Sequence, residues 1–233
     1  MSLGYHFRTA LIVAFSLLAV PVVVLACWWC ALPRQAGTPP PEADVAKDAQ
    51  DYLRENKPEP LPEVLAAPTK PLVPTDQHAL LNQLAPGFTL TDADGNPVEL
   101  DDLLSRGPVV VVFYFGYQCN HCVSQLFDLN EDIQHFRGLD ATVVAISPDK
   151  SEHTRERYKK YGAFDFPVLA DVDHAVARKY GVSRPAVAGL KAWEAHGTFV
   201  IGRDRYIHWA KTGDEPFTGN GTLLAEIKRL EGK

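Results

Sequence analysis

Two cysteines, Cys119 and Cys122, stand where a strand pattern gives way to a helix pattern. Residues 109–115 are valines and aromatics only, which predicts a fully buried strand, and a three-residue turn then leads to Cys119. After the pair, apolar residues recur at spacings of three and four and predict one buried helix face: Leu126, Leu129, Ile133 and Phe136. In open α/β sheets, ligands and chemistry gather at the carboxyl ends of the strands. The sequence therefore predicts an α/β fold with a dithiol at the edge of its sheet.

The spacing and context of this pair favour redox chemistry. Two thiols one helical turn apart can close a disulfide with little backbone movement. Cys119, at the start of the helix, would meet free N–H groups and the positive end of the dipole, which favour the nucleophilic thiolate. A structural zinc site needs four ligands, and the nearby His121 and His135 are poorly spaced to complete one. Inert buried cysteines are the other alternative. We expect a redox dithiol that needs no metal and no cofactor.

The N-terminal segment predicts the compartment. No charged residue occurs from Thr9 to Leu32, about 24 residues or ~36 Å of helix, enough to cross a bilayer. Residues 1–32 are therefore expected to be a membrane anchor, with a cleaved signal peptide or a lipidated Cys27 as alternatives. Each alternative places the remaining chain outside the cytoplasm, and we expect the periplasmic side of a bacterial inner membrane.

A second pair with the same spacing, Cys27 and Cys30, falls at the end of this apolar segment. It could exchange electrons with the first pair. It could equally consist of small apolar residues in a membrane helix, and the sequence leaves its role open.

Residues 33–76 are expected to be a tether, because ten of the eighteen prolines fall there and favour extended polyproline II structure. Residues 42–56 within it predict one marginal helix, with a weak apolar face of Val45, Ala49, Tyr52 and Leu53. The remaining residues, 77–233, suit one domain. A formal charge of −6 without a basic run argues against nucleic-acid binding.

Strand and helix patterns alternate along this domain and predict a mixed sheet flanked by helices. The expected strands are 88–90 and 97–100 around an Asp-Gly-Asn turn, 109–115, 141–146, 168–169, 198–201 and 206–209. The expected helices are 101–105, the one after Cys119, one ending at Tyr161, 174–180 after an Asp173 cap, and 221–230.

Four segments, taken with this order of elements, resemble the AhpC/TSA family, the peroxiredoxin-like branch of the thioredoxin fold. They are LAPGFTL at 84–90, VVAISPD at 143–149, FPVLAD at 166–171 with VARKYGV at 176–182, and TFVI at 198–201. The resemblance spans nearly all of residues 84–209. It implies a thioredoxin-like fold and a redoxin, with antioxidant peroxidase activity as one possible function.

Departures from the family bear on that function. The family's peroxide-reactive cysteine lies in a Pro-x-x-x-Thr-x-x-Cys loop, but Val112 and Gly116 occupy the proline and threonine positions. The family's activating arginine is replaced by His196, just before strand 198–201. Without that hydroxyl and guanidinium, the donors that would stabilise a breaking O–O bond are missing. The proline that faces the dithiol in thioredoxins is also replaced, by Gly197.

Two further resemblances concern the dithiol loop. The CxxC resembles that of thioredoxins and disulfide isomerases, and His121 before the second cysteine predicts a depressed Cys119 pKa and an oxidising potential. Residues 114–119 also resemble the loop of the membrane-anchored Sco copper chaperones, which bind copper with two cysteines and a distant histidine. His196 or His208 could be that histidine, although the cysteine spacing here is one residue shorter.

The sequence thus predicts a membrane-tethered thiol–disulfide oxidoreductase, with a peroxidase and a copper chaperone as alternatives. The expected catalytic residues are Cys119, Cys122 and His121, and the expected substrate-proximal residues are Gly116, Tyr117, Gln118, His196 and Gly197. The expected partners are protein thiols or disulfides, or peroxide, with an unidentified electron donor and the membrane.

Overall fold

The structure is a computed structural model that describes residues 44–56, 61, 72–117, 119–189 and 192–232. The predicted anchor, the pair Cys27 and Cys30 and much of the proline-rich tether lie outside these residues. No described helix is long and apolar enough to cross a membrane. The chain divides into two units, 1–42 and 43–233, and all described residues belong to the second.

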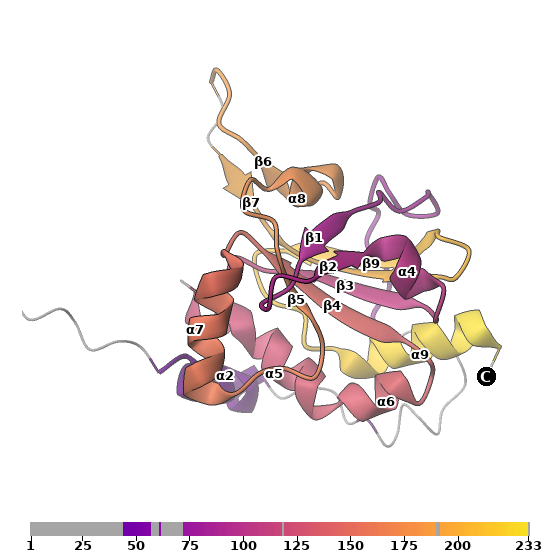
Figure 1. The fold of residues 1–233 in the computed structure, drawn as a ribbon. Helices are drawn as coiled ribbons and strands as arrows, with labels where there is room; N and C mark the ends of the chain where they lie inside the picture. Colours follow the sequence, from indigo (N-terminus) through magenta and orange to yellow (C-terminus); the bar gives the residue numbers. More distant parts are fainter. Residues whose placement is uncertain (1–43, 57–60, 62–71, 118, 190–191, 233) are drawn as a thin grey trace, which may run out of the picture. The chain divides into compact units, whose positions relative to one another are not determined.

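The second unit is built on a seven-stranded mixed sheet with the order β2-β1-β5-β4-β3-β8-β9 (Figure 1). The strands are β1 Thr89–Thr91, β2 Pro97–Glu99, β3 Val109–Phe113, β4 Thr142–Ser147, β5 Val168–Ala170, β8 His196–Ile201 and β9 Ile207–Gly213. Strands β3, β4 and β5 are parallel, whereas β1, β2, β8 and β9 pair antiparallel. The predicted mixed sheet and both predicted hairpins are confirmed.

Helices cover both faces of this sheet (Figure 1). They are α2 Val45–Asn56, α4 Leu100–Leu104, the 3₁₀ helix η1 Asn120–Val123, α5 Ser124–Glu131, α6 Ile133–Arg137, α7 Ser151–Tyr161, α8 Ala175–Lys179 and α9 Asn220–Glu231. One core cluster joins α2, α5, α6 and α9 to one face, and the other joins α4 and α8 to the opposite face.

Strand β3 lies between these two cores. Val110 and Val112 face the first cluster, and Val109, Val111 and Phe113 face the second, as the alternation of a strand requires. All five residues are buried because β3 has a strand on each edge and helices over both faces. The predicted buried strand is confirmed, and its carboxyl end leads into the dithiol loop.

The helical region after the dithiol is divided into η1, α5 and α6. The predicted stripe is confirmed, since Leu126, Leu129, Ile133 and Phe136 are all buried. Asp132 interrupts the helix with φ −97° and ψ 3°, and its carboxylate accepts a hydrogen bond from the Asn220 side-chain N–H at 2.8 Å. The break is a tertiary feature that the apolar spacing does not reveal.

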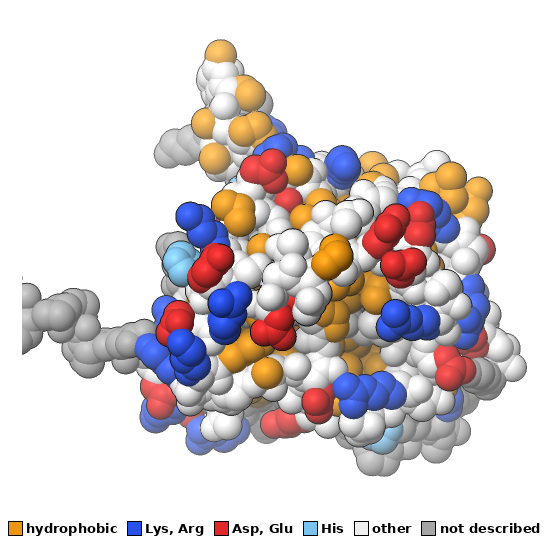
Figure 2. All heavy atoms as spheres, viewed as in Figure 1, with side chains coloured by type: hydrophobic (Ala, Val, Ile, Leu, Met, Phe, Trp, Pro, Cys, Tyr) orange, Lys and Arg blue, Asp and Glu red, His pale blue; other side chains and the backbone are white. Residues whose placement is uncertain are grey.

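Two features depart from the predicted organisation. The marginal helix expected within the tether is present as α2, and Val45 and Ala49 are buried where it packs against η1 and α5 of the same unit. A two-stranded arm, β6 Ser183–Arg184 and β7 Trp193–Glu194, was not predicted. It projects from the body of the domain and carries exposed hydrophobic side chains, among them Val187 and Trp193 (Figure 2).

Candidate active site

Cys119 and Cys122 form a disulfide, with their Cα atoms 5.2 Å apart. Cys119 is partly exposed and precedes η1, whereas Cys122 lies within η1 and is fully buried. The Cys122 backbone N–H donates to the Cys119 carbonyl oxygen at 3.0 Å, which closes the turn between them. One sulfur is thus accessible to a reactant, and the other is positioned to attack only the first.

The loop between β3 and Cys119 is held by the Asp149 carboxylate, which follows β4. Asp149 Oδ2 accepts a hydrogen bond from the Tyr117 backbone N–H at 2.8 Å. Gly116 has φ +83°, and a Cβ at that position would lie 2.5 Å from the same oxygen. Glycine is needed there for both reasons, because L side chains rarely adopt this conformation.

Sequence reasoning did not single out Asp149, although a signal was present. The carboxyl ends of parallel strands meet at one edge of a sheet, and Asp149 and Cys119 each follow such an end. The side chain of Tyr117, by contrast, is buried between Tyr114 and Tyr161, with ring centroids 5.9 and 6.1 Å away. This burial raises the pKa of Tyr117, and its phenol lies in the core while its backbone N–H donates to Asp149. Gln118 lies outside the described residues.

His121 lies against the disulfide. Its Nδ1 and Nε2 are 3.4 and 3.5 Å from Cys119 Sγ, and Nε2 is 4.0 Å from Cys122 Sγ. The imidazole is exposed to solvent. When the disulfide is reduced, an imidazolium in this position would stabilise a thiolate on Cys119. The predicted grouping of Cys119, His121 and Cys122 is present.

His196 occupies the end of β8 that lies nearest the dithiol loop, since its neighbour Gly197 pairs with Phe113. The His196 Nδ1–H donates to the Asp214 carbonyl oxygen at 3.0 Å, and Nε2 has no partner among the described residues. Its ring centroid is 4.4 Å from that of Phe115. Burial lowers the pKa of His196, and the nearby charge of His121 adds to this effect. In neutral His196, the unprotonated Nε2 is therefore a buried hydrogen-bond acceptor.

His208, the other histidine considered as a copper ligand, lies far from the dithiol loop. Strands β8 and β9 are antiparallel, and His196 pairs with Gly213 whereas Ile201 pairs with Ile207. His208 therefore lies at the opposite end of β8, roughly 15 Å along the strand. Its Nε2 there contacts the Asp204 carboxylate at 3.0 Å. Of the two histidines, only His196 is at the dithiol end of the sheet.

A buried polar pair lies beneath the dithiol. Gln125, one helical turn after Cys122, donates its side-chain N–H to Thr198 Oγ1 at 2.8 Å. Both residues are almost completely buried, and Gln125 Oε1 has no partner among the described residues. This bond ties α5, which directly follows η1 and Cys122, to β8, the strand that carries His196.

Two thiolates and an imidazole could also hold a soft metal ion. The ligand atoms of Cys119, His121 and Cys122 lie within 4.8 Å of one another. Thiolate and imidazole ligands suit Cu(I) and zinc. The disulfide would have to be reduced first, so binding of a metal and storage of a disulfide exclude each other here.

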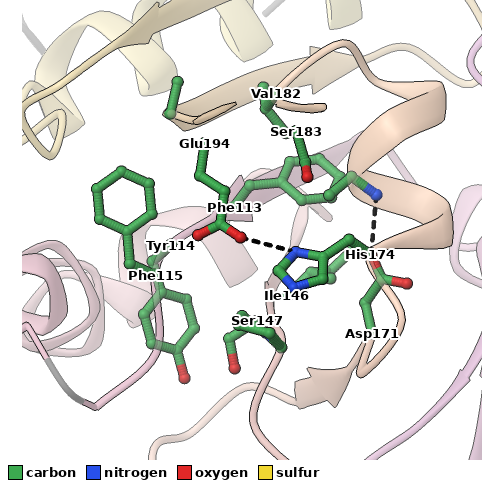
Figure 3. A pocket seen from close by; sticks show the side chains of 13 residues that line it. Phe113, Tyr114, Phe115, Ile146, Ser147, Asp171, His174, Val182, Ser183 and Glu194 are labelled. Carbon is green, nitrogen blue, oxygen red and sulfur yellow. Dashed lines mark hydrogen bonds and ion pairs between the residues drawn. The ribbon is translucent and has the colours of Figure 1, made fainter. Parts of the chain in front are cut away.

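A small, shallow pocket opens at the carboxyl ends of β3 and β4 (Figure 3). Phe113, Phe115, Ile146 and Val182 give it apolar walls. An ion-pair contact across it, between His174 Nδ1 and Glu194 Oε1 at 3.2 Å, joins the residue before α8 to β7. Phe115 lies in the pocket wall and also contacts His196, so the pocket adjoins the candidate site.

Comparison with known proteins identifies the family to which this chain is similar. The model of the AhpC/TSA family matches residues 81–210, more than half of the chain. A crystal structure of the peroxidoxin BcpB from Mycobacterium tuberculosis superposes with a TM-score of 0.59 and 27% identity, covering 66% of this chain and 99% of that one.

Relatives of two kinds are similar in sequence. Peroxiredoxin Q from Sedum lineare chloroplasts is 36% identical over 51% of this chain and 61% of its own length. The thiol-disulfide oxidoreductase ResA of Bacillus subtilis is 30% identical over 42% of this chain and 54% of its own length. The chain thus spans little more than half the length of these relatives.

Proposed function

Since the chain belongs to the AhpC/TSA family, we propose that it is a membrane-tethered thiol–disulfide oxidoreductase that works through Cys119 and Cys122. The observation that carries this proposal is the disulfide between a partly exposed cysteine and a fully buried one. Similarity to ResA, a named thiol–disulfide oxidoreductase, supports it.

The geometry suggests the order of events. The Cys119 thiolate attacks one sulfur of a client disulfide, which forms a mixed disulfide and releases the other client sulfur as a thiolate. Cys122 then attacks Cys119 Sγ, releases the second client thiol and leaves the Cys119–Cys122 disulfide. Two electrons have passed to the client, and a separate electron donor must return the dithiol. In the reverse direction, the disulfide form oxidises a client dithiol.

His121 and the neighbouring pocket fit this scheme. His121, within 3.5 Å of Cys119 Sγ, would stabilise the attacking thiolate. The hollow beside Phe115 adjoins the dithiol, and its apolar rim would contact the part of the client next to its disulfide. Gly116, His196 and Gly197 are buried, so they would support the dithiol loop from within and not contact the client directly.

The decisive experiment is trapping with Cys122→Ser in the full chain. This variant keeps the attacking cysteine and lacks the resolving one, so mixed disulfides with clients should accumulate. The Cys119→Ser variant is the matched control and should trap none. Absence of any mixed disulfide, with a model disulfide peptide as well as with envelope proteins, would refute the exchange mechanism.

A thiol peroxidase is the second candidate, because the relatives include a peroxiredoxin Q and a peroxidoxin. Against it stand Gly116 and His196, which supply neither the hydroxyl nor the guanidinium of the family's peroxide site. Mixing the reduced protein with hydrogen peroxide and following tryptophan fluorescence separates the two. A rate orders of magnitude above that of an ordinary thiolate would favour the peroxidase.

Copper delivery is a third candidate, supported by the three ligand atoms at the reduced site. It predicts tight Cu(I) binding that is lost in each of three variants, Cys119→Ser, Cys122→Ser and His121→Ala. Competition with a chromogenic Cu(I) chelator measures this. Weak binding that does not depend on both cysteines would exclude it.

We also propose that the domain works on the periplasmic side of a bacterial inner membrane, held by residues 1–32. The support is the uncharged stretch from Thr9 to Leu32. Membrane fractionation followed by protease treatment of spheroplasts tests it. A domain that remains in the soluble fraction, or that is protected from external protease, would contradict this location.

A further inference from the structure

Helix α2 brings a residue from outside the matched family region to the dithiol. The Tyr52 ring stacks on His121, with centroids 5.8 Å apart and planes 29° from parallel. The position of Tyr52 does not depend on this contact alone. Val45 and Ala49, on the same helix, are buried and hold α2 against η1 and α5.

The hydroxyl end of Tyr52 is fixed as well. It donates to the Glu215 carboxylate at 3.2 Å. Partial burial and the negative charge of Glu215 raise the pKa of Tyr52, so the phenol remains a neutral donor. The preceding residue, Asp214, accepts the hydrogen bond from His196 Nδ1. Residues 214–215 thus hold both histidines of the site, His196 directly and His121 through Tyr52.

We propose that Tyr52 is a positioning residue of the redox site, which keeps the His121 imidazole against Cys119 Sγ. This inference rests on the proposed exchange function. The face of a phenol ring is negative and attracts an imidazolium. An imidazolium beside Cys119 stabilises the thiolate, and a more stable reduced form makes the dithiol more oxidising. The tether helix is therefore part of the active site and not only a spacer.

A double-mutant cycle in the full chain tests the proposal. Tyr52→Ala is made alone and together with His121→Ala, and two properties are measured for each protein. One is the alkylation rate of Cys119 by iodoacetamide, and the other is the equilibrium of the dithiol with glutathione. Tyr52→Ala should slow alkylation about two- to fivefold and shift the equilibrium toward the protein disulfide. With His121→Ala present, Tyr52→Ala should have no further effect.

Three matched variants separate positioning from folding. Tyr52→Phe keeps the ring and should retain most of the wild-type rate. Tyr52→Leu keeps the apolar burial without an aromatic face and should behave as Tyr52→Ala. Gln50→Ala, on the exposed side of the same helix, should match the wild type.

Two outcomes would overturn the proposal: an effect of Tyr52→Ala that is equally large without His121, or unchanged alkylation and equilibrium with Tyr52→Leu. Neither readout uses a client. A protein that cycles between dithiol and disulfide but ignores Tyr52 would refute this inference alone. Failure of the wild type to cycle would refute the proposed function.

Discussion

Phe113 and Gly197 face each other in the β3–β8 pairing, at the point where the chain leaves β3 for the dithiol loop. A Cβ at position 197 would lie 2.6 Å from Val182 Cγ1 and 2.9 Å from Phe199 Cε2. Close packing therefore requires glycine where thioredoxins carry proline.

Gly197→Ala should destabilise the protein by about 1–3 kcal/mol, because the added methyl overpacks this contact. Urea unfolding measures the change. Adding Val182→Ala to the same chain should recover part of the loss, since it removes the nearest atom. A change in the free energy of unfolding of less than about 0.5 kcal/mol, as is typical of surface sites, would show that Val182 and Phe199 move aside at little cost.

Gly116→Ala should lower the free energy of unfolding more than Gly95→Ala does, although both glycines have similar positive φ angles. Gly95 has φ +88° with nothing within 4 Å of its added Cβ, so its substitution measures backbone strain alone, about 1 kcal/mol. Gly116→Ala adds the collision with Asp149. Equal free energies of unfolding for the two variants would mean that the Asp149 carboxylate adapts without cost.

His196 should make stability depend on pH. Its pKa is lowered in the folded protein by burial, so the unfolded chain binds the proton first as the pH falls below about 6.5. Stability should decline from there down to the folded pKa. His196→Gln should lose less stability than the wild type between about pH 7.5 and about pH 5, as measured by urea unfolding. Identical losses in the two proteins would contradict a buried neutral imidazole.

The two thiols of the reduced protein should differ in reactivity. Cys119 is partly exposed and Cys122 is fully buried, so limiting iodoacetamide should modify Cys119 first. Peptide mapping by mass spectrometry identifies the labelled cysteine. Equal labelling of both would indicate that reduction exposes Cys122.

The strand and the dithiol could be predicted because their signals are local, whereas the place of Gly197 opposite the dithiol was implied by the resemblance to the thioredoxin fold. The run over 109–113 has no polar residue, which predicts a strand buried on both faces. The burial of Leu126 and Leu129 also follows from their spacing.

The contacts that complete the site were not predictable in this way. Tyr52 is 67 residues before Cys119 in a segment rich in proline, and only the tertiary packing of Val45 and Ala49 brings it to His121. The Asp149 contact with the 116–117 turn likewise depends on how two strand ends are juxtaposed. The β6–β7 arm has no periodic apolar pattern from which it could be recognised.

The pairing of Gly116 with Asp149 constrains how such a chain can evolve. A mutation that introduced the family's threonine at 116 would place a side chain in the left-handed region and in the space of the carboxylate. Such a mutation would cost least in a chain whose side chain at 149 and whose turn at 116–117 had changed first. A threonine at 116 in this loop would therefore carry two costs at once, the strained backbone and the displaced carboxylate.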